Sequence, residues 1–582
     1  MDARATTIAP ALTLTAWAGF AAMCTGMFMA ILDIQVVATS LPTIQEALKI
    51  RQDQMSWIQT SYLIAEVIAI PLTGMLTHAL TMRWLSVVTT AVFTLASIGC
   101  AYSGSFEELL VWRVVQGFAG GLLIPQVFAA GFSLFPARGQ ATATTIAGIL
   151  AVMAPTLGPW VGGWITSTFD WPWLFLVNVL PGIAAVAVAI WALPREKPQT
   201  RLLRQLDWLG MGLLIVTLAS LEIGLKQAPQ DGWLSVTVFA LLCAAALAGG
   251  LFVLRCLIHR TPLVDLTAFA DRRFALGCLL SFVLGIGLYG MVYLMPVFLA
   301  FVRGHDALEI GHIMVVTGAA QLVIAPLVVW GERRADARLL TACGFVLFAG
   351  GLFMSAFQSR GTDFDDMLFP QILRGAAVML CLLPPVRIAM GHLAPEAIAN
   401  ASGLFNLMRN LGGAIGLALI DTVIYGRAPV IGERYGQALA GGSVEAAKAV
   451  GLPMEKFLAH VPGTAIEPGI LGFVRSAVER QSLTVAINEA WAMLAVLTLI
   501  GGAATMLYLY RSRQGVAGPG EPIEAFAPSW VFYTGRAETT PSMLLRPILS
   551  THPGISIGVG PNSRAPALKA PAVGDGDGRK AS

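Results

Sequence analysis

Charged residues are scarce in this chain. Asp, Glu, Lys and Arg together make up 12% of the 582 residues, and hydrophobic residues make up 56%. A water-soluble domain carries about 25% charged residues. The mean hydropathy is +0.72, and the net charge of +3 is too small to indicate a nucleic-acid partner. The composition therefore predicts a polytopic membrane protein.

Signatures of catalysis and metal binding are also missing. The 7 cysteines are scattered singly, without the paired spacing of metal ligands. No Walker or GxSxG sequence occurs, and the GxGxxG of Gly285, Gly287 and Gly290 lies inside an apolar run with no strand before it. His305 and His312 lack metalloprotease spacing. We therefore predict no enzyme activity, no metal site and no cofactor.

A series of apolar runs has the length that membrane helices need. About 20 apolar residues make one helical crossing. Runs rich in Leu, Ala, Gly and Met, without ten-residue alternation, favour helices over a barrel. The runs lie near residues 14–38, 56–77, 84–102, 109–131, 144–166, 173–193, 208–226, 234–255, 274–301, 309–330, 338–357, 368–390, 402–423 and 487–509. The sequence thus predicts an all-α fold with about fourteen transmembrane helices.

The placement of Lys and Arg predicts the orientation. If the N-terminus is cytoplasmic, the short inner segments hold most of these residues, and the short outer loops hold only Lys49, Arg51, Lys226, Arg303 and Arg360. This bias predicts that both termini are cytoplasmic, with the protein in the inner membrane. Residues 1–13 are then a cytoplasmic N-terminus, and the first apolar run is a retained span rather than a removed signal peptide.

Two longer segments are predicted to lie outside the membrane. Residues 424–486 carry several charges and form an outer loop long enough to fold locally, with some helix. The C-terminal residues 511–582 are rich in Pro, Gly and Ser. Such a composition cannot bury enough apolar surface to fold, so we expect a disordered cytoplasmic tail.

The chain contains a weak internal repeat. WRVVQG (112–117) in the fourth span has a counterpart in ILRGAA (372–377) in the twelfth, and MRWL (82–85) before the third matches ARLL (337–340) before the eleventh. Glycines are also placed similarly in residues 141–163 and 399–416. The constant offset of eight spans predicts two six-helix bundles, 14–193 and 274–510, joined by a linker, 194–273, that holds two extra helices.

Several motifs occur in a recognisable order. They are LDIQVVATSLPTIQ (32–45), WIQTSYLIAEVIAIPLTGML (57–76), RVVQGFAGGLLIPQ (113–126), APTLGPWVGGWI (154–165) and WPWLFLVNVLPG (171–182). As an ordered set they resemble the major facilitator superfamily, in particular its fourteen-span drug:proton antiporters of the EmrB/QacA type. The resemblance covers roughly residues 14–510. It implies the major facilitator fold, two six-helix bundles that alternate access to a central cavity, and export driven by a proton gradient without ATP.

Two positions depart from the family pattern. The family's loop between spans two and three usually carries Gly, an acid and a basic cluster, whereas residues 74–85 keep Gly74 and Arg83 but lack the acid. This loop is thought to steady one conformational state in the family. Glu66 also stands where relatives often have an uncharged polar residue.

Asp33 and Arg113 are charges inside apolar spans, where a charge is costly unless it has a function. On a helix Asp33 shares a face with small or pliable residues, including Gly26 and Ser40, and therefore faces protein or water rather than lipid. Burial and a nearby cation act on its protonation in opposite senses. Arg113 is the natural cation if the fourth span lies against the first, as the resemblance implies. The alternative is a fixed structural ion pair.

Glu66 lies on a polar stripe with Gln59, Tyr62 and Thr73. We interpret it as a second carboxylate for protons or for a cationic substrate; the alternative is a side chain that reaches back to the outer interface. Arg374 lies near Gln371, and Arg409 shares a stripe with Asn406. The second-half residues are expected to line a cavity, although a structural role for Arg409 is an equal alternative. The predicted substrate-cavity residues are Gln59, Tyr62, Gln116, Arg374, Asn406 and Arg409.

The fifth span carries Pro155, Gly158, Pro159, Gly162 and Gly163, which match the family's antiporter motif. Proline removes a helix hydrogen bond and glycine permits close approach, so this span is expected to bend and seal against a neighbour. Together with Gly74 and Arg83 these are the predicted gating residues.

The sequence therefore predicts a proton-coupled exporter of small amphipathic or lipophilic compounds such as drugs. The resemblance also implies a periplasmic adaptor and an outer-membrane channel as possible partners, because related permeases of two-membraned bacteria use them. Two alternatives stay open: a same-fold importer or exporter of fatty acids or metabolites, and a non-transporting membrane scaffold or sensor.

Overall fold

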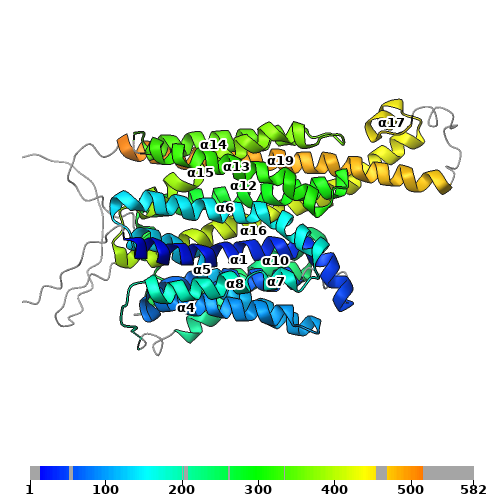
Figure 1. The fold of residues 1–582 in the computed structure, drawn as a ribbon. Coiled ribbons are helices and arrows are strands. Elements are labelled where there is room, and N and C mark those ends of the chain that lie inside the picture. The colour runs from blue at the N-terminus through cyan, green and yellow to red at the C-terminus, as the bar shows by residue number, and fades with distance from the viewer. Residues whose placement is uncertain are drawn as a thin grey trace, which may run out of the picture. The chain divides into compact units, whose positions relative to one another are not determined.

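The computed structural model describes residues 13–50, 57–199, 201, 207–259, 262–332, 334–453 and 468–514. Residues 1–12 of the predicted N-terminal segment and residues 515–582 of the predicted tail lie outside the described residues. Every element that the structure assigns in the described ranges is helical. This confirms the all-α prediction, and the long helices lie side by side along a common direction (Figure 1).

The first half consists of α1 (Leu14–Leu48), α3 (Trp57–Ala69), η1 (Ile70–Leu72), α4 (Thr73–Ala101), α5 (Phe106–Ser133), α6 (Ala137–Thr168), α7 (Trp173–Leu176) and α8 (Val179–Ala192). The inserted pair is α10 (Trp208–Asp231) and α11 (Val236–Ile258). The second half consists of η2 (Leu266–Ala270), α12 (Arg272–Phe298), η3 (Leu299–Arg303), α13 (Ala307–Glu332), α14 (Ala337–Met354), η4 (Ser355–Phe357), α15 (Phe364–Met390), α16 (Pro395–Ala440), α17 (Val444–Val450) and α19 (Pro468–Gln514).

The described helices account for the predicted number of crossings. Twelve stretches are long and apolar enough to cross a membrane, or thirteen if the bent α6 is counted as one span. One of them, Trp57–Ala101, has 45 residues and is interrupted at Thr81, where φ is 71° and ψ is 157°. A β-branched residue rarely adopts this backbone conformation, and it ends one helix and starts the next. Counted as two spans, this stretch brings the total to about fourteen, as predicted.

Short polar side chains fix where many of the helices begin. Ser105 accepts a hydrogen bond from the amide of Glu108, and Asp363 forms a capping box with Asp366 at the start of α15. At the base of the inserted pair Asp207 accepts from the amide of Gly210 and pairs with Arg255 at 2.7 Å. Burial raises the pKa of the Asp207 carboxyl, but these two partners outweigh it and leave the pKa below its ordinary value.

The two halves repeat one pattern of neighbours. In the first half α1 packs against α5, α6 and α8, and in the second α12 packs against α15, α16 and α19. The pairs α3 with α5 and α4 with α8 recur as α13 with α15 and α14 with α19. Helices separated by eight spans therefore occupy equivalent places, in agreement with the repeat in the sequence.

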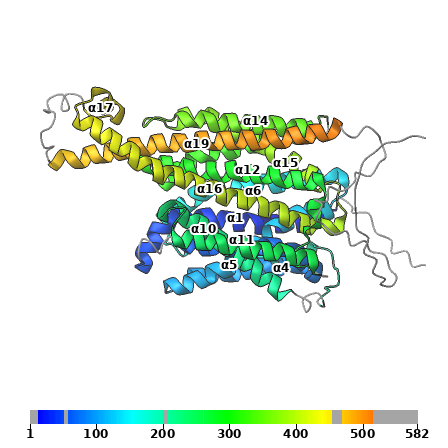
Figure 2. The same cartoon turned by 180° about the vertical axis from the view of Figure 1, so that it is seen from behind.

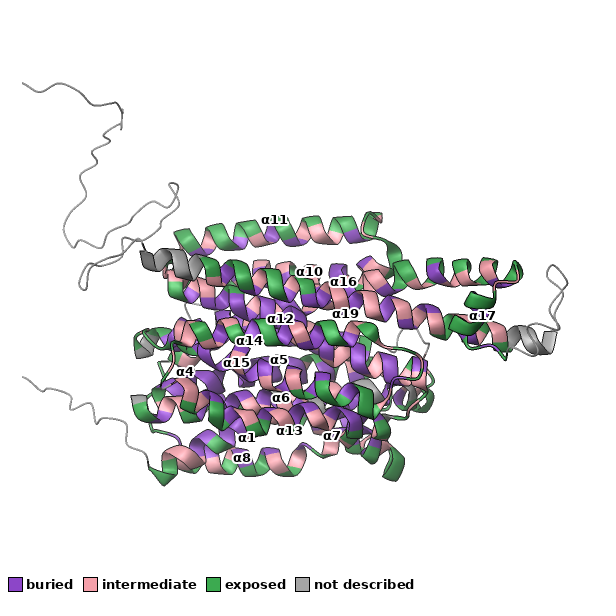
Figure 3. Ribbon diagram, turned by 90° about the horizontal axis from the view of Figure 1, so that it is seen from above, coloured by how far each residue is buried: buried purple, intermediate pink, exposed green. Residues whose placement is uncertain are grey.

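The halves meet along two seams. In one, α6 lies against α13; in the other, α16 lies against α4, η1 and α5. The inserted helix α10 packs on both α3 and α16, so it touches both halves, and α11 lies outside it (Figure 2). In Figure 3 buried residues gather between the helices, whereas α11 is largely exposed. Its exposed large apolar side chains, which suit contact with lipid, are Val236, Phe239, Leu247, Leu251, Val253, Leu254, Leu257 and Ile258.

The predicted outer loop 424–486 is mostly an extension of two membrane helices. Helix α16 continues to Ala440 rather than ending near residue 423, and α19 already begins at Pro468. With α17 these ends extend beyond the neighbouring helices (Figure 1). They share a small apolar cluster of Leu439, Ala446, Ala447, Val450, Leu452 and Ala477. Residues 454–467 of the predicted loop lie outside the described residues.

The α6–α13 seam depends on a glycine, which leads to a first prediction. A Cβ added at Gly311 would lie 2.3 Å from Cβ of Trp160, whereas a Cβ at Gly350 would meet no atom within 4 Å. Overpacking an interior costs about 1 to 3 kcal/mol. Gly311→Ala should therefore lower the melting temperature of the purified protein. The matched control Gly350→Ala should keep it or raise it slightly, because alanine favours helix; equal melting temperatures for both variants would contradict this packing.

Candidate functional site

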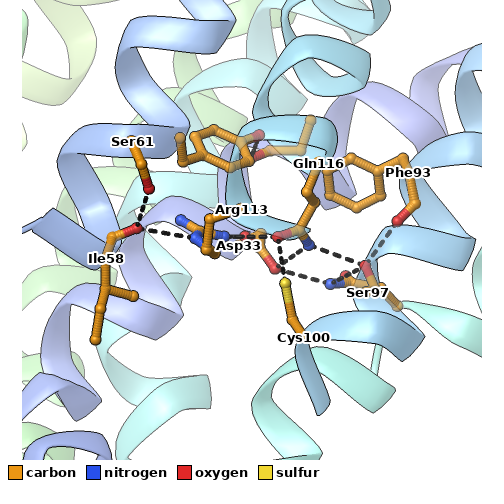
Figure 4. Close-up of polar contacts among 11 residues, drawn as sticks. Asp33, Ile58, Ser61, Phe93, Ser97, Cys100, Arg113 and Gln116 are labelled. Carbon is orange, nitrogen blue, oxygen red and sulfur yellow. Dashed lines mark hydrogen bonds and ion pairs between the residues drawn. The ribbon is translucent and has the colours of Figure 1, made fainter. Parts of the chain in front are cut away.

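A buried ion pair occupies the core of the first half. Nη1 of Arg113, on α5, lies 2.5 Å from Oδ2 of Asp33, on α1, and neither side chain is exposed. Figure 4 shows the carboxylate and the guanidinium pointing toward one another among the helices. The small residues predicted to share the Asp33 face, including Gly26 and Ser40, are also buried. Both charges are therefore inside protein and away from the lipid-facing surface.

Three uncharged polar side chains complete the surroundings of Asp33. Its Oδ1 accepts hydrogen bonds from Nε2 of Gln116 at 3.0 Å and from Nδ2 of Asn178 at 2.9 Å. Gln116 also accepts from Arg113 Nη1 at 2.7 Å and donates to Oγ of Ser97 at 2.9 Å. The network thus joins α1, α4 and α5 to the segment between α7 and α8. A carboxylate held in this way is stabilised as the charged form by hydrogen bonds and by its cation.

Aromatic rings and a main-chain carbonyl hold the arginine in place. Its Nε donates to the carbonyl of Ile58 at 3.1 Å. Its guanidinium carbon lies 4.3 Å from the ring centroid of Tyr62 and 5.8 Å from that of Phe175. The Tyr62 hydroxyl donates to the carbonyl of Ala30 at 3.0 Å. Helix α3 approaches α5 this closely because Gly117 has no side chain: a Cβ there would lie 2.2 Å from the Tyr62 carbonyl oxygen.

One donor of the pair has no partner. Nη2 of Arg113 is buried and makes no hydrogen bond to any described residue. A buried donor without a partner is costly, so a further hydrogen-bonding group at this position would be stabilised by Arg113.

Glu66 is buried between the halves rather than near the outer interface. It is 2% exposed, and Tyr62 and Thr73 of the same stripe are fully buried, so this stripe contacts protein. The polar stripe therefore faces protein rather than lipid, and of its four residues only Gln59 is part-exposed. The charge of Glu66 is attracted by Arg409 of α16, in the other half. A cross-bundle attraction of this kind changes when the halves move.

Arg409 and Asn406 lie at the seam of α16. Arg409 donates to Oδ1 of Asn406, and its guanidinium carbon lies 5.8 Å from the ring centroid of Phe128 on α5. One turn earlier Ser402 donates to the carbonyl of Pro125 at 2.7 Å, a direct bond between halves. The stripe predicted on α16 therefore contacts the first half.

Arg374 lies in the core of the second half without a carboxylate among its described contacts. It is 2% exposed, its Nη2 lies 3.7 Å from Sδ of Met295, and its guanidinium covers the Trp491 ring at 4.7 Å. Its Nε and Nη1, Nε2 of Gln371, the side-chain amide of Gln321 and Nε1 of Trp491 are buried without partners in the described residues. Buried polar groups without partners are costly, so this cluster is suited to receive a ligand or water.

Of the predicted gating residues, Gly74 lies at the seam between the halves, whereas Gly158 and Arg83 contact other helices of the first half. A Cβ at Gly74 would lie 2.7 Å from Cα of Asn400 on α16, and one at Gly158 would lie 2.2 Å from Cβ of Gln35 on α1. Helix α6 bends by 49° between Pro155 and Trp160. Gly162 and Gly163 are buried after the bend, and the side chain of Pro159 lies outside the described part. Arg83 donates to the carbonyl of Ile190 of the first half itself.

Sequence reasoning missed four residues. Ser97 and Asn178 contact the Asp33 network, yet uncharged polar residues are common in membrane helices and give no signal of their own. Glu222 and Lys226 lie on α10 beside α3. Glu222 could have been found, because it is a charge inside an apolar span, the same criterion that singled out Asp33. Among the described residues no group of three or more His, Cys, Asp or Glu side chains could hold a metal ion.

The amino-acid sequence of this chain matches one family model and several named proteins. Residues 23–417 match the model of the Major Facilitator Superfamily. The colistin resistance protein EmrB of Acinetobacter baumannii is 39% identical over 410 residues, 70% of this chain and 80% of that protein. The multidrug export protein EmrB of Escherichia coli (strain K12) is 30% identical over 404 residues, 69% of this chain and 79% of that protein.

Two further matches are a relative that is named for a different substrate class and a solved structure of similar fold. The fatty acid resistance protein FarB of Neisseria gonorrhoeae is 26% identical over 477 residues, 81% of this chain and 92% of that protein. A solved structure of the proton:xylose symporter XylE aligns with a TM-score of 0.52 at 12% identity, over 85% of this chain and 95% of that one. The second similarity concerns the fold alone.

A double-mutant cycle tests the Asp33–Arg113 pair. Arg113→Met leaves the carboxylate buried without its cation, which typically costs about 3 to 5 kcal/mol. Asp33→Asn combined with Arg113→Met removes both charges and should cost markedly less than Arg113→Met alone. The free energy of unfolding of the purified protein is measured for each single variant and for the double variant, with the exposed Arg138→Met as control. Additive effects of the two substitutions would show that the charges do not interact.

Proposed function

The chain belongs to the Major Facilitator Superfamily, and on this premise we propose that it is a proton-coupled exporter of small amphipathic or lipophilic compounds. The observation that carries the proposal is the buried Asp33–Arg113 pair in the core of the first half. Relatives named for multidrug export and colistin resistance support export of drug-like molecules. The family and the many apolar helices make the protein a multi-pass membrane protein.

The proposed mechanism is alternating access of the two halves. A proton from outside binds Asp33, frees Arg113 from its partner, and resets the state that released the substrate. A proton that crosses about 100 mV and one pH unit supplies roughly 2.3 and 1.4 kcal/mol. That is enough for a roughly several-hundredfold substrate gradient. ATP and a bound cofactor have no part in this scheme.

The placement in the cell is part of the proposal. The distribution of Lys and Arg supports cytoplasmic termini in the inner membrane. The extended ends of α16 and α19, together with α17, would then lie outside that membrane. They would offer a surface for a periplasmic adaptor that leads to an outer-membrane channel.

A second candidate cargo is a fatty acid or another lipophilic acid. The relative named for fatty acid resistance favours it, and so does Arg374, whose described surroundings contain donors but no carboxylate. A buried guanidinium with free donors matches the geometry of a carboxylate. On this view Arg374 and Gln371 would hold the head group of an acidic substrate.

Asp33→Asn tests proton coupling. The amide can still accept a hydrogen bond from Arg113 but cannot bind and release a proton. Everted vesicles that carry the variant should lose proton-driven efflux of ethidium, while expression and ethidium binding persist. The exposed Asp170→Asn should transport like the parent. Full pH-gradient-dependent efflux by Asp33→Asn would remove the coupling assignment, and no efflux by the parent of any compound class would favour the scaffold alternative.

Arg374→Gln separates the two cargo classes. Loss of a cation that pairs with a carboxylate typically costs about 1.5 to 3 kcal/mol of binding. Efflux of a long-chain fatty acid from everted vesicles should therefore fall about tenfold or more, whereas efflux of ethidium should change little. The exposed Arg273→Gln serves as control. An equal loss for both cargoes would assign Arg374 a structural role instead.

A further inference from the structure

The inserted helix α10 is bound to both halves of the protein. Nζ of Lys226 donates to Oγ1 of Thr60 on α3 and lies 5.8 Å from the ring centroid of Trp57. Just beyond α10, Nε1 of Trp233 donates to Oγ1 of Thr422 on α16 at 3.0 Å. In Figure 2 the pair α10–α11 lies beside α16. Movement of one half relative to the other must therefore change contacts of α10.

Helix α10 brings a second carboxylate to the neighbourhood of Glu66. Glu222 precedes Lys226 by one helical turn and so shares its face, which packs toward α3. Thr60, the partner of Lys226, lies on the same helix as Glu66, so the Lys226 face of α10 brings Glu222 to the helix of Glu66, where their charges repel one another and Lys226 attracts the charge of Glu222. Glu222 is therefore placed beside a buried acid of the first half, inside an apolar span.

Groups from four helices surround these two acids. Arg409 of α16 attracts the charge of Glu66, as does Arg113 of α5. Tyr289 of α12 lies near Arg409 and both acids, and its hydroxyl donates to Oδ1 of Asn410 at 2.8 Å. The first half, the inserted pair and the second half thus each contribute charged groups to one cluster, namely Glu66, Glu222, Lys226 and Arg409.

We propose that Glu66 and Glu222 hold one proton between them, so that the inserted helix takes part in proton coupling and does not merely cover the bundle. Two carboxylates that repel one another lose the repulsion when one is protonated. Arg409 belongs to the half that moves relative to Glu66. When it approaches, its charge favours release of the shared proton; when it withdraws, the pair takes the proton up. The role of the shared proton in transport rests on the proposed function. The sharing itself is a property of the protein at rest and can be measured without transport.

Carbodiimide labelling tests the pair without any transport assay. Dicyclohexylcarbodiimide reacts with protonated carboxyl groups in apolar surroundings, and peptide mass spectrometry locates the adduct. In purified full-length protein, Glu66→Gln removes the repulsion on Glu222. The labelling of Glu222 should then reach half its maximum about one pH unit lower than in the parent. The reciprocal Glu222→Gln should shift Glu66 in the same sense, and the exposed Asp231→Asn on the same helix should shift neither.

Transport measurements give the second arm. Glu222→Gln should lose most of the pH-gradient-driven ethidium efflux, whereas Glu222→Asp, which keeps the carboxyl group, and Asp231→Asn should retain it. Unmoved labelling midpoints would overturn the shared proton, and parent-like efflux by Glu222→Gln from pH 6 to pH 8 would overturn the role of α10. Neither result affects the coupling assignment of Asp33, which its own variant tests separately.

Discussion

One constraint governs this structure: a charge placed among apolar helices needs a partner or a task. The first half meets it with Asp33 and Arg113, locked by Gln116 and Asn178 into a network that reaches α1, α4 and α5. Much of the packing around the pair holds its two side chains in place. Gly117 lets α3 approach so that Tyr62 covers the guanidinium. Removal of either member of such a pair leaves the other charge buried and uncompensated, which is strongly destabilising.

The two halves share a fold but not their charges. Equivalent helices make equivalent contacts, yet the arginine core of the first half contains an acid, whereas the described core around Arg374 contains Met295, Gln371 and Trp491. This asymmetry supports our proposal that the first half binds the proton at Asp33 and that Arg374 of the second half binds an acidic cargo. The seam between them carries the Glu66–Arg409 attraction, at the place where α10 also touches both.

The sequence allowed the fold class, the approximate number of spans and the repeat to be predicted, because long apolar runs are a strong signal of membrane helices and the matching motifs recur at a constant offset of eight spans. Asp33 and Arg113 could also be recognised, because a charge inside an apolar run is conspicuous. The sequence indicated two separate spans here, but not that one residue, Thr81, interrupts the helix, because a β-branched residue with positive φ has no sequence signature. Ser97 and Asn178 were missed because a hydroxyl or amide costs little in a helix. Glu222 was missed although its signal was present.

In the proposed mechanism the Asp33 carboxyl changes its ionisation under working conditions. Infrared difference spectroscopy of the purified protein measures this directly, because a protonated carboxyl group has a carbonyl band that the ionised form lacks. We expect a carbonyl band that disappears as the pH rises through the range of transport and that is missing in Asp33→Asn. A spectrum in which Asp33 stays ionised at every pH at which the protein transports would contradict it.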